Sequence, residues 1–508
     1  MTLNALDLVA FVAFIALVIG VSLAASRKEA SAEDYFLAGR GLPWWLIGFS
    51  LIASNISTEH FVGMAGRGYE LGLAIASYEW MAAVTLVIVG LYFLPRFLRS
   101  GIYTIPEFLE YRYDTGARTL MAAYVMLAYV FVALATVLFA GALALEAVFG
   151  IDVVVGIWLI GLLAGAYTIY GGLKAVVWSD LIQGLALLLG GVLVTVLGFR
   201  AIGGWQPFVE AAGGRLHTVL PWNHPEMPWL AVFIGGLWIP NLFYWGLNQF
   251  ITQRTLAARS LADGQRGIIL AAFLKLLIPF IIVFPGIMAA ELYADRIATP
   301  DQAYPILIRD LLPAGLTGIM FAALFGAVMS SLDSMLNSAA TIFTIDLYKR
   351  HLRPDAPPRR LMNVGRVATA VLMVAGCLWA PIVARAGSIF DYIQMFWGFI
   401  SPGIVAAFLF GLFSPRTPAS AAKGAMVLGI PVYGALLWFL PGVAFLHHMF
   451  ITFLVLAAFM AMETARRPLE RPAALPVQEG FDLEPAPGIR GWSAAVVVAT
   501  VALYALFW

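Results

Sequence analysis

The sequence predicts an all-α membrane protein with about fourteen transmembrane helices, and three observations support this fold class. Of the 508 residues, 62% are hydrophobic and only 12% are charged, whereas roughly a quarter of an ordinary soluble domain is charged. The apolar residues stand in long runs, and about 20 such residues cross a bilayer core as a helix. These runs do not alternate in segments of about ten residues, so they favour helices over a membrane β-barrel.

Fourteen apolar runs are long enough to cross a membrane. Their approximate bounds are residues 4–25, 43–65, 72–95, 119–149, 152–171, 179–199, 228–251, 266–290, 314–346, 363–384, 388–413, 420–440, 445–462 and 491–508. The first run holds Asp7 near its start and no basic residue before it. This does not fit the positively charged start of a secretory signal, so we expect a retained first helix.

The Lys and Arg residues predict the orientation of these helices. If the N-terminus lies outside the cell, the inner loops carry 22 of the 30 basic residues and the outer loops carry six. An excess of positive charge on the cytoplasmic side is the usual bias. We therefore expect a multi-pass protein of the plasma (inner) membrane with its N-terminus outside. The Pro-rich, charged loop at residues 463–490 reads as a mobile cytoplasmic linker before the last helix.

Two of the runs are interrupted. The second run holds "SLIASNISTEH" (Ser50–His60), and the seventh holds "GLWIPNLFYWGLNQF" (Gly236–Phe250) with Pro240 inside it. Proline removes a helix hydrogen bond, and paired breaks in corresponding positions mark the binding site of inverted-repeat transporters. The two runs are five apart, as two repeats of five helices require. Two ordinary kinks are the alternative.

Ionisable side chains inside the runs are few and costly, so they are candidates for function. Glu79 and Lys275 either form a structural pair or line a water-filled path, and Asp180 is either interfacial or functional. In the ninth run, Ser330 and Ser331 share one helical face with Ala327. Hydroxyls and free carbonyls suit a small hard cation, although serine hydroxyls also bond back to their own helix.

Several other classes of function are not supported. We find no P-loop, nucleotide fingerprint or metal-ligand cluster in the sequence, so ATP-driven pumping has no basis. The one cysteine, Cys377, cannot form a disulfide within the chain, and the formal net charge of +1 does not point to a nucleic-acid partner.

At the two interrupted runs and at the serine residues of the ninth run, the sequence resembles the sodium:solute symporter family, and within it the sodium/glucose and sodium/galactose cotransporters. The matching segments are "DYFLAGRGLPWW" (Asp34–Trp45), "LIASNISTEHFVGMAG" (Leu51–Gly66), "ASYEWMAA" (Ala76–Ala83), "TIPEFLEYRY" (Thr104–Tyr113), "YGGLKAVVWSDLIQG" (Tyr170–Gly184), "NLFYWGLNQFITQRTLAARS" (Asn241–Ser260), "AAFLKLLIPFIIVFPG" (Ala271–Gly286), "FAALFGAVMSSLDSMLNSAATIFTIDLY" (Phe321–Tyr348) and "YIQMFWGFISPGI" (Tyr392–Ile404). They run in order from residue 34 to about residue 415.

The resemblance implies a LeuT-like core of two inverted repeats of five helices. The implied organisation is 1–42 for an extra helix and a cytoplasmic loop, 43–200 for the first repeat, 201–227 for an outer loop, 228–415 for the second repeat, and 416–508 for three further helices and the linker. The implied function is sodium-coupled symport of a sugar, a hexose such as galactose or glucose, by alternating access. Such a protein is a secondary active transporter and no enzyme.

The resemblance also implies a set of site residues. The sodium ion, the only cofactor implied, would be bound by carbonyls of Ala53, Ile56 and Ala327 and by hydroxyls of Ser330 and Ser331. The sugar site would comprise Asn55, His60, Glu79, Asn241, Tyr244, Trp245, Lys275 and Gln394. Met64, Tyr78 and Phe390 would form an outer gate. His60 stands where bacterial galactose carriers have glutamine, which leaves the particular sugar open.

Asp333 carries a further expectation. With Ser334 and Asp180 it could form a second cation site, like that of family members which couple two sodium ions. The alternative is a structural pair between Asp333 and a basic residue.

Three other functions stay open. The first is sodium symport of another solute, such as myo-inositol or sialic acid. The second is a membrane sensor, and the third is a sodium-gated channel. A sensor is disfavoured because the chain ends at Trp508, directly after its last helix. The oligomeric state is not predicted.

Overall fold

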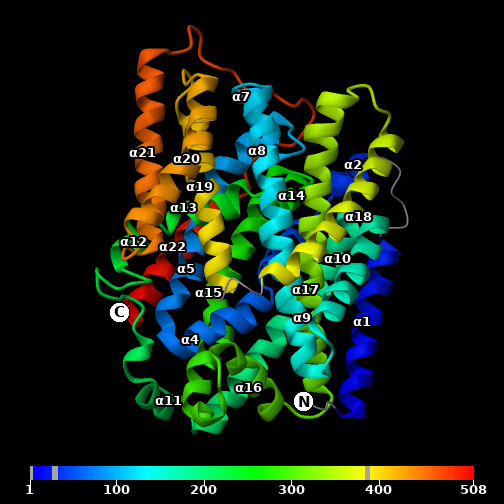
Figure 1. The fold of residues 1–508 in the computed structure, drawn as a ribbon, viewed down its shortest axis with the longest axis vertical. Helices are drawn as coiled ribbons and strands as arrows, with labels where there is room; N and C mark the ends of the chain where they lie inside the picture. Colours follow the sequence, from blue (N-terminus) through cyan, green and yellow to red (C-terminus); the bar gives the residue numbers. More distant parts are fainter. Residues whose placement is uncertain (1–3, 26–31, 384–388) are drawn as a thin grey trace.

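The helices stand roughly side by side along one axis of the molecule, in the computed structural model shown in Figure 1. The structure describes residues 4–25, 32–383 and 389–508. In the first part of the chain, the α-helices are α1 (Ala5–Ala25), α2 (Ala32–Leu37), α3 (Trp44–Asn55), α4 (Ala65–Leu71), α5 (Ser77–Ile88), α6 (Leu94–Ser100), α7 (Ile105–Arg112), α8 (Thr115–Ala128), α9 (Ala135–Phe149) and α10 (Val153–Ile202). They continue with α11 (Trp205–Ala212), α12 (Trp229–Phe233), α13 (Trp238–Leu242), α14 (Gln249–Leu256), α15 (Leu261–Leu292), α16 (Ala303–Leu311), α17 (Leu316–Thr341), α18 (Pro358–Val383), α19 (Ile389–Phe413), α20 (Ala419–Phe439), α21 (Phe445–Arg466) and α22 (Ile489–Leu506).

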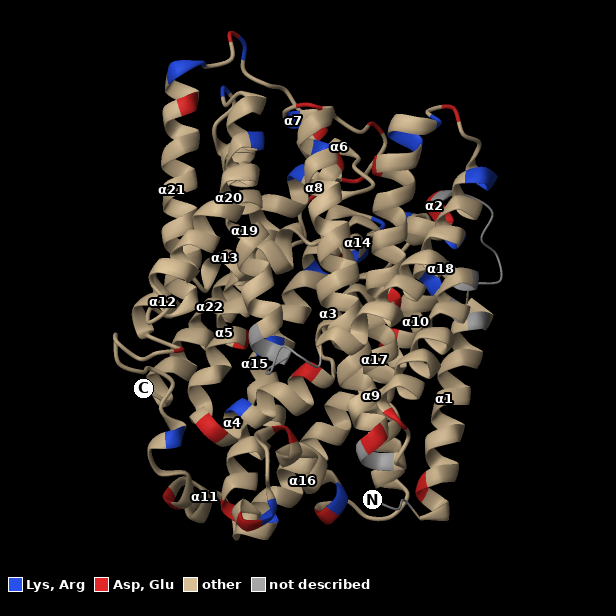
Figure 2. Ribbon diagram, viewed as in Figure 1, with Lys and Arg blue, Asp and Glu red and all other residues tan. Residues whose placement is uncertain are grey.

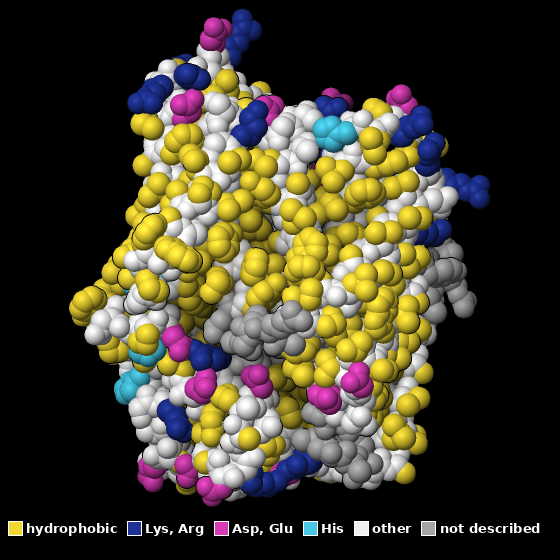
Figure 3. Space-filling view, viewed as in Figure 1, with side chains coloured by type: hydrophobic (Ala, Val, Ile, Leu, Met, Phe, Trp, Pro, Cys, Tyr) yellow, Lys and Arg dark blue, Asp and Glu magenta, His cyan; other side chains and the backbone are white. Residues whose placement is uncertain are grey.

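A belt with little charge surrounds the middle of the molecule. Figure 2 shows that most Lys, Arg, Asp and Glu residues gather toward the two ends of the helices. Hydrophobic side chains cover the surface between these ends (Figure 3). On α18, for example, Val367, Val371 and Leu378 are each more than 60% exposed. Exposed apolar side chains on this scale mark a surface in contact with lipid, as a multi-pass membrane protein requires.

Twelve helical stretches among the described residues are long and apolar enough to cross a membrane, against the fourteen runs predicted. The remaining two runs are helical but short. The first, α3, has 12 residues because the helix ends at Asn55. The second, Val153–Ala166, is the first part of α10, which continues past a kink at Gly172. The difference therefore lies in the lengths of two helices.

Both interruptions predicted from the sequence are present. After α3, Ile56 is extended (φ −75°, ψ 103°) and the helix resumes as a π-helical segment at Glu59–Met64. In the second case, α13 leads into a π-helical segment at Phe243–Leu247, and Asn248 is extended (φ −87°, ψ 120°) before α14 begins. The backbone thus leaves the helical conformation eight residues beyond Pro240, which lies inside α13.

Among the candidate membrane spans of the described residues, the one that begins with α17 is the most buried, and α17 packs against α1, α10 and α18. Every residue from Met320 to Thr341 is buried, including Ser330, Ser331, Asp333 and Ser334 near the middle of the helix. Polar groups buried in this way must find partners inside the protein. The helix that carries Ser330, Ser331 and Asp333 is therefore the centre of the core.

Both ends of the chain lie in the half of the molecule that contains α11 and α16 (Figure 1). Near the N-terminus, the Asp7 carboxylate accepts hydrogen bonds from the backbone N–H groups of Gly315 (2.7 Å) and Gly318 (3.1 Å). Near the C-terminus, the Phe507 carbonyl accepts one from the Thr218 N–H (2.8 Å). Ends on the same side are what an even number of crossings produces.

The segment between α21 and α22, residues 467–488, differs from the mobile linker that was expected. We call it the strap. Its backbone donates to the carbonyls of Arg416 (from Leu469, 2.9 Å) and Arg99 (from Gln478, 2.7 Å), and the Asp482 carbonyl accepts from the Leu261 N–H (2.9 Å). These bonds hold the strap across the ends of α6, α15 and α20, which the proline content could not reveal.

Candidate functional site

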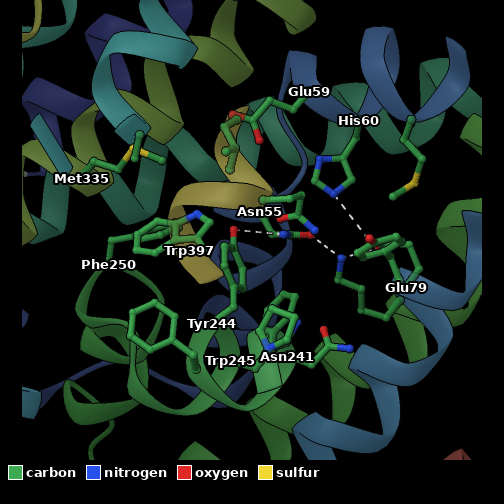
Figure 4. Close-up of a pocket in the computed structure, with 18 residues that line it drawn as sticks. Asn55, Glu59, His60, Glu79, Asn241, Tyr244, Trp245, Phe250, Met335 and Trp397 are labelled. Atoms are coloured by element: carbon green, nitrogen blue, oxygen red, sulfur yellow. Dashed lines mark hydrogen bonds and ion pairs between the residues drawn. The ribbon is translucent and has the colours of Figure 1, made fainter. Parts of the chain in front are cut away.

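The two interrupted helices face a pocket in the middle of the molecule (Figure 4). Its walls come from the break after α3, from α5, from α13 and the π-helical segment that follows it, and from α15 and α19. It is lined by Asn55, Glu59, His60, Met64, Tyr78, Glu79, Ala133, Pro240, Asn241, Phe243, Tyr244, Trp245, Phe250, Lys275, Met335, Ile393, Gln394 and Trp397. All eight residues of the predicted sugar site are in this set.

A buried ionic cluster forms one side of the pocket. The Lys275 ammonium, on α15, donates to the Glu79 carboxylate on α5 and to the Asn55 amide oxygen at the end of α3. Lys275 is 0% and Glu79 is 3% exposed. Charges this deeply buried are tolerated only when they are paired and hydrogen-bonded. The pair neutralises itself and fixes the Asn55 side chain at the break.

His60 and Tyr244 extend this cluster across the pocket (Figure 4). The Nε2 atom of His60 lies 3.4 Å from the Glu79 carboxylate, and the Asn55 amide donates to the Tyr244 hydroxyl at 3.0 Å. The cluster therefore joins the break in the second predicted span to the break in the seventh, which lie almost 200 residues apart in sequence.

Aromatic rings form another side of the pocket. The rings of Tyr244 and Trp245 are 5.2 Å apart, and the ring of Phe250 is 5.4 Å from Tyr244. The Lys275 ammonium stands 4.9 Å from the centre of the Trp245 ring, within the range of a cation–π interaction. Apolar faces beside a polar cluster suit a ligand that has both hydroxyl and C–H surfaces.

Two buried polar atoms of the lining residues have no hydrogen-bond partner among the described residues, namely Nδ2 of Asn241 and Nδ1 of His60. Buried polar groups in proteins are almost always bonded. Such atoms, at a pocket wall, are free to bond a solute. Gln394 also lines the pocket, from α19.

The predicted outer gate is described only in part. Met64 and Tyr78 line the pocket, and Met64 is 4% exposed. Phe390 belongs to α19, but its side chain lies outside the described residues.

Eight lining residues were not predicted as parts of the site, namely Glu59, Ala133, Pro240, Phe243, Phe250, Met335, Ile393 and Trp397. Five of them had a signal in the sequence. Glu59, Pro240, Phe243 and Phe250 stand within the two interrupted segments, and Trp397 is three residues after Gln394 on the same helix face. Met335 enters from α17, and an apolar residue among apolar neighbours gives no such signal.

The residues of the predicted sodium site lie on two neighbouring elements. Ala53 and Ile56 flank the end of α3, and the other three are on α17. The two elements meet where the Ser331 hydroxyl lies 3.5 Å from the Ser54 carbonyl and the Ser54 hydroxyl lies 3.2 Å from that of Ser334. The last carbonyls of a helix have no partner within it, so the end of α3 can offer them to a cation.

Close packing brings α10 against this helix end. A Cβ atom at Gly184 of α10 would lie only 2.7 Å from the Cβ of Ala53. A glycine at that position therefore allows the backbone around Ala53 to approach α10.

Arg254 is a buried cation beside the predicted sodium ligands. It is 0% exposed, and its guanidinium donates to the Asp180 carboxylate (2.9 Å), the Ser50 hydroxyl (2.6 Å) and the Ser334 hydroxyl (2.5 Å). Asp180 also accepts from Ser330 (2.5 Å). The expected second cation site is thus not an open set of oxygens, because an arginine side chain occupies the space between Asp180 and Ser334.

Asp333 lies apart from this arginine. One of its carboxylate oxygens accepts from the Thr168 hydroxyl (2.7 Å) on α10, and the other has no partner among the described residues. Among the residues that the structure describes, no ion pair involves Asp333. The alternative that was expected, a pair between Asp333 and a basic residue, is therefore not seen: the buried pair is Asp180 with Arg254.

Comparisons with known proteins agree with this geometry. Residues 35–430 match the family described as "Sodium:solute symporter family". The sodium/glucose cotransporter of Vibrio parahaemolyticus is 44% identical, with 100% of this chain and 99% of that protein covered. The sodium/myo-inositol cotransporter 2 of Sus scrofa is 36% identical, with 84% of this chain and 69% of its own length covered.

A solved structure shares the fold. It is the substrate-bound outward-open state of a Na⁺-coupled sialic acid symporter, which reveals a novel Na⁺ site in that protein. It superposes with a TM-score of 0.80 at 25% identity, over 93% of this chain and 99% of the other. The likeness over nearly the whole length confirms the predicted fold class, an all-helical membrane transporter with a LeuT-like core. This chain belongs to the sodium:solute symporter family and is a sodium-coupled symporter, a secondary active transporter with sodium as its co-substrate.

Proposed function

We propose that the solute is a sugar, a hexose such as galactose or glucose, and that it binds in the central pocket. The observation that carries this proposal is the hydrogen-bonded cluster of Asn55, Glu79 and Lys275 facing the rings of Tyr244 and Trp245. A hexose has hydroxyls that need fixed donors and acceptors and a C–H face that packs on an aromatic ring. A site built for hydroxyls rejects analogues that lack them, because its buried groups are left unpaired.

The charge balance of the pocket favours a neutral solute. Lys275 is already paired with Glu79, and His60 lies 3.4 Å from the same carboxylate, so no Lys or Arg that lines the pocket is left to neutralise a solute carboxylate. A carboxylate-bearing solute such as sialic acid would bring its own charge into a buried site, which is costly without a partner. Myo-inositol is a neutral polyol and is the second candidate, supported by the similarity to a sodium/myo-inositol cotransporter.

The proposed roles follow from the positions of the side chains. Asn55, Glu79 and Lys275 present hydrogen-bonding atoms at one side, and Asn241, His60 and Gln394 supply further donors and acceptors. Tyr244 and Trp245 form the aromatic face, with Tyr244 on the side toward the cytoplasm. Met64, Tyr78 and Phe390 would close the pocket from outside.

The proposed sodium ligands are the carbonyls of Ala53, Ile56 and Ala327 and the hydroxyls of Ser330 and Ser331. Ala53 and Ile56 flank Asn55 at the end of α3. A cation that fixes this helix end therefore also fixes Asn55, which reaches into the sugar pocket. Binding must then be reciprocal, so that the sugar also raises the affinity for sodium.

A second cation near Asp180, Asp333 and Ser334 is the alternative arrangement. Arg254 already supplies a positive charge to Asp180 and Ser334, so one sodium ion per cycle is the simpler arrangement. The oxygen of Asp333 without a partner is the one feature that favours a second ion.

We further propose that the N-terminus lies outside, so that the symporter moves both co-substrates into the cell across the plasma (inner) membrane. Moving one charge across 100 mV releases about 2.3 kcal/mol, and the sodium gradient adds to this. The two repeats would rock around the pocket and open it first outward and then inward.

Uptake into proteoliposomes tests the choice of solute. Radiolabelled galactose, glucose, myo-inositol and sialic acid should be compared with and without an inward sodium gradient. We expect a hexose to accumulate only with the gradient. Sodium-driven accumulation of sialic acid but of no hexose would refute the sugar assignment.

A further inference from the structure

A cavity of about 500 Å³ lies beneath the strap, at the end of the molecule away from both chain termini. The π-helical segment Val89–Phe93, the end of α6 and the start of α15 form one wall, with Leu91, Arg99 and Leu261. The strap and the first turn of α22 form the other, with Val477, Leu483 and Arg490. This cavity is separate from the central pocket, and no residue lines both.

Hydrogen bonds between its two walls hold this cavity in place. The Gln478 N–H donates to the Arg99 carbonyl (2.7 Å). Gln265 bridges the two walls, because its amide oxygen accepts from the Ala486 N–H (2.9 Å) and its amide nitrogen donates to the Gly90 carbonyl (3.1 Å). The positions of the strap and of α6 are therefore fixed relative to each other.

Arg99 and Arg490 give the cavity an uncompensated positive charge. Both side chains are exposed, and among the described residues neither guanidinium has a hydrogen bond or an ion pair. Other arginines at this end do have acidic partners, such as Arg259 with Asp263. The acidic residues of the strap, among them Asp482, do not line the cavity. Two free arginines on opposite walls can bond one anion between them.

The shape of the guanidinium favours a phosphate group, since its planar fork matches phosphate oxygens in a bidentate manner. Leu91, Leu261, Val477 and Leu483 add apolar surface beside the charges. A site that combines two arginines with apolar walls suits a phosphate attached to a carbon skeleton.

We propose that this cavity binds a phosphate group, carried either by an anionic phospholipid or by a soluble phosphorylated molecule. The phosphate would bridge Arg99 of α6 and Arg490 of α22, and so tie the strap and the last helix to the transport core. The proposal does not depend on which solute is transported.

Two measurements on the full-length purified protein test the proposal. Native mass spectrometry after addition of phosphatidylglycerol or phosphatidylcholine measures retained lipid, and thermal unfolding with inorganic phosphate or chloride at equal ionic strength measures soluble binding. The test variant is Arg99→Gln/Arg490→Gln. The matched control is Arg359→Gln/Arg360→Gln, which removes two exposed arginines at the same end that do not line this cavity.

The lipid source predicts that the unaltered protein and the control retain phosphatidylglycerol but not phosphatidylcholine. The test variant should then bind phosphatidylglycerol at least about tenfold more weakly, because hydrogen bonds to a charged group are lost. If the phosphate comes from a soluble molecule, inorganic phosphate should instead raise the Tm of the unaltered protein and of the control variant, but not that of the test variant.

The proposal is overturned if the test variant equals the unaltered protein in both measurements, or if the control loses binding to the same extent. Both arginines lack partners, so the test variant should unfold at the same temperature as the unaltered protein when no ligand is added. If its Tm falls, Arg99→Lys/Arg490→Lys keeps the charge, and it must then restore binding at least in part.

Discussion

Single residues at the pocket show why a transporter keeps charges inside a membrane. Lys275, Glu79 and Asn55 hold one another in place, and each also faces the pocket. A solute hydroxyl can join such a cluster without moving any charge. Preorganised polar groups lose little freedom when the solute binds, so the binding energy is retained.

Replacing Glu79 with glutamine tests this role. Glu79→Gln leaves the buried Lys275 without its ionic partner, and a hydrogen bond to a charged group is lost. We expect the apparent KM for the sugar to rise about tenfold or more, measured as sodium-driven uptake in proteoliposomes. Glu110→Gln is the control. The Glu110 carboxylate accepts a hydrogen bond from Arg118 (2.7 Å), and Glu110 does not line the pocket. An unchanged KM in Glu79→Gln would remove this carboxylate from the sugar site.

Ser330 offers the corresponding test of the sodium site. Ser330→Ala removes a proposed sodium ligand, so the sodium concentration for half-maximal uptake should rise about tenfold or more. Ser338→Ala is the matched control on the same helix, where the hydroxyl donates to Gln253 at 2.7 Å and not to a proposed site. Equal sodium dependence of the two variants would count against Ser330 as a ligand.

At the scale of elements, the breaks could be read from the sequence but their exact positions could not. Polar residues in the second and seventh runs predicted both interruptions. Pro240 suggested that the interruption of the seventh run lies close to this proline, yet the extended residue is Asn248. The reason is that α13 begins at Trp238, so Pro240 stands in a first turn, where a missing N–H costs little.

Arg254 shows a limit of another kind. The sequence ends the seventh run near residue 251, so Arg254 counted as an inner-loop cation, whereas the structure buries it on α14. Asp180 is more than 70 residues away in sequence, and nothing local pairs the two. Only the packing of α3, α10, α14 and α17 brings them together, which is why the sequence could not predict this ion pair beside the proposed second cation site.

The pair makes a prediction about stability. Arg254→Gln leaves Asp180 as an unpaired buried charge, which should cost about 3–5 kcal/mol. The double variant Arg254→Gln/Asp180→Asn removes both charges and should unfold at a higher temperature than the single variant. Arg259→Gln breaks an exposed pair and should leave the Tm nearly unchanged. Additive effects of the two substitutions would show that the pair is not coupled.

The contact between α3 and α10 makes another prediction at this scale. Alanine in place of glycine normally favours a helix by about 1 kcal/mol. At Gly184, however, the added methyl group would press on Ala53 and shift its carbonyl. We therefore expect Gly184→Ala to weaken the sodium dependence of uptake severalfold. Gly20→Ala on α1, where the added Cβ has no atom within 4 Å, is the control. Identical behaviour of both variants would contradict this role of α10.

The fold class of the whole molecule was predictable because long apolar runs recur along the entire chain. Part of the central pocket was predictable because Glu79, Lys275 and the two interrupted segments stand out against apolar surroundings, whereas Gln394 followed only from the family resemblance. The ordered strap was not, since its hydrogen bonds join residues far apart, such as Gln478 and Arg99. Proline and charge in a loop indicate only that it is no helix.

Coupling between the two binding sites is the central claim for the molecule as a whole. Ala53 and Ile56 are proposed to bind sodium, and Asn55 between them reaches the sugar pocket, so each co-substrate should raise the affinity for the other by the same factor.

Titration calorimetry of galactose or glucose binding to the purified protein, in sodium chloride and in choline chloride, tests this most directly. We predict at least about tenfold tighter sugar binding in sodium, and an equal gain in sodium affinity when the sugar is present. Equal sugar affinity in the two salts would contradict the account.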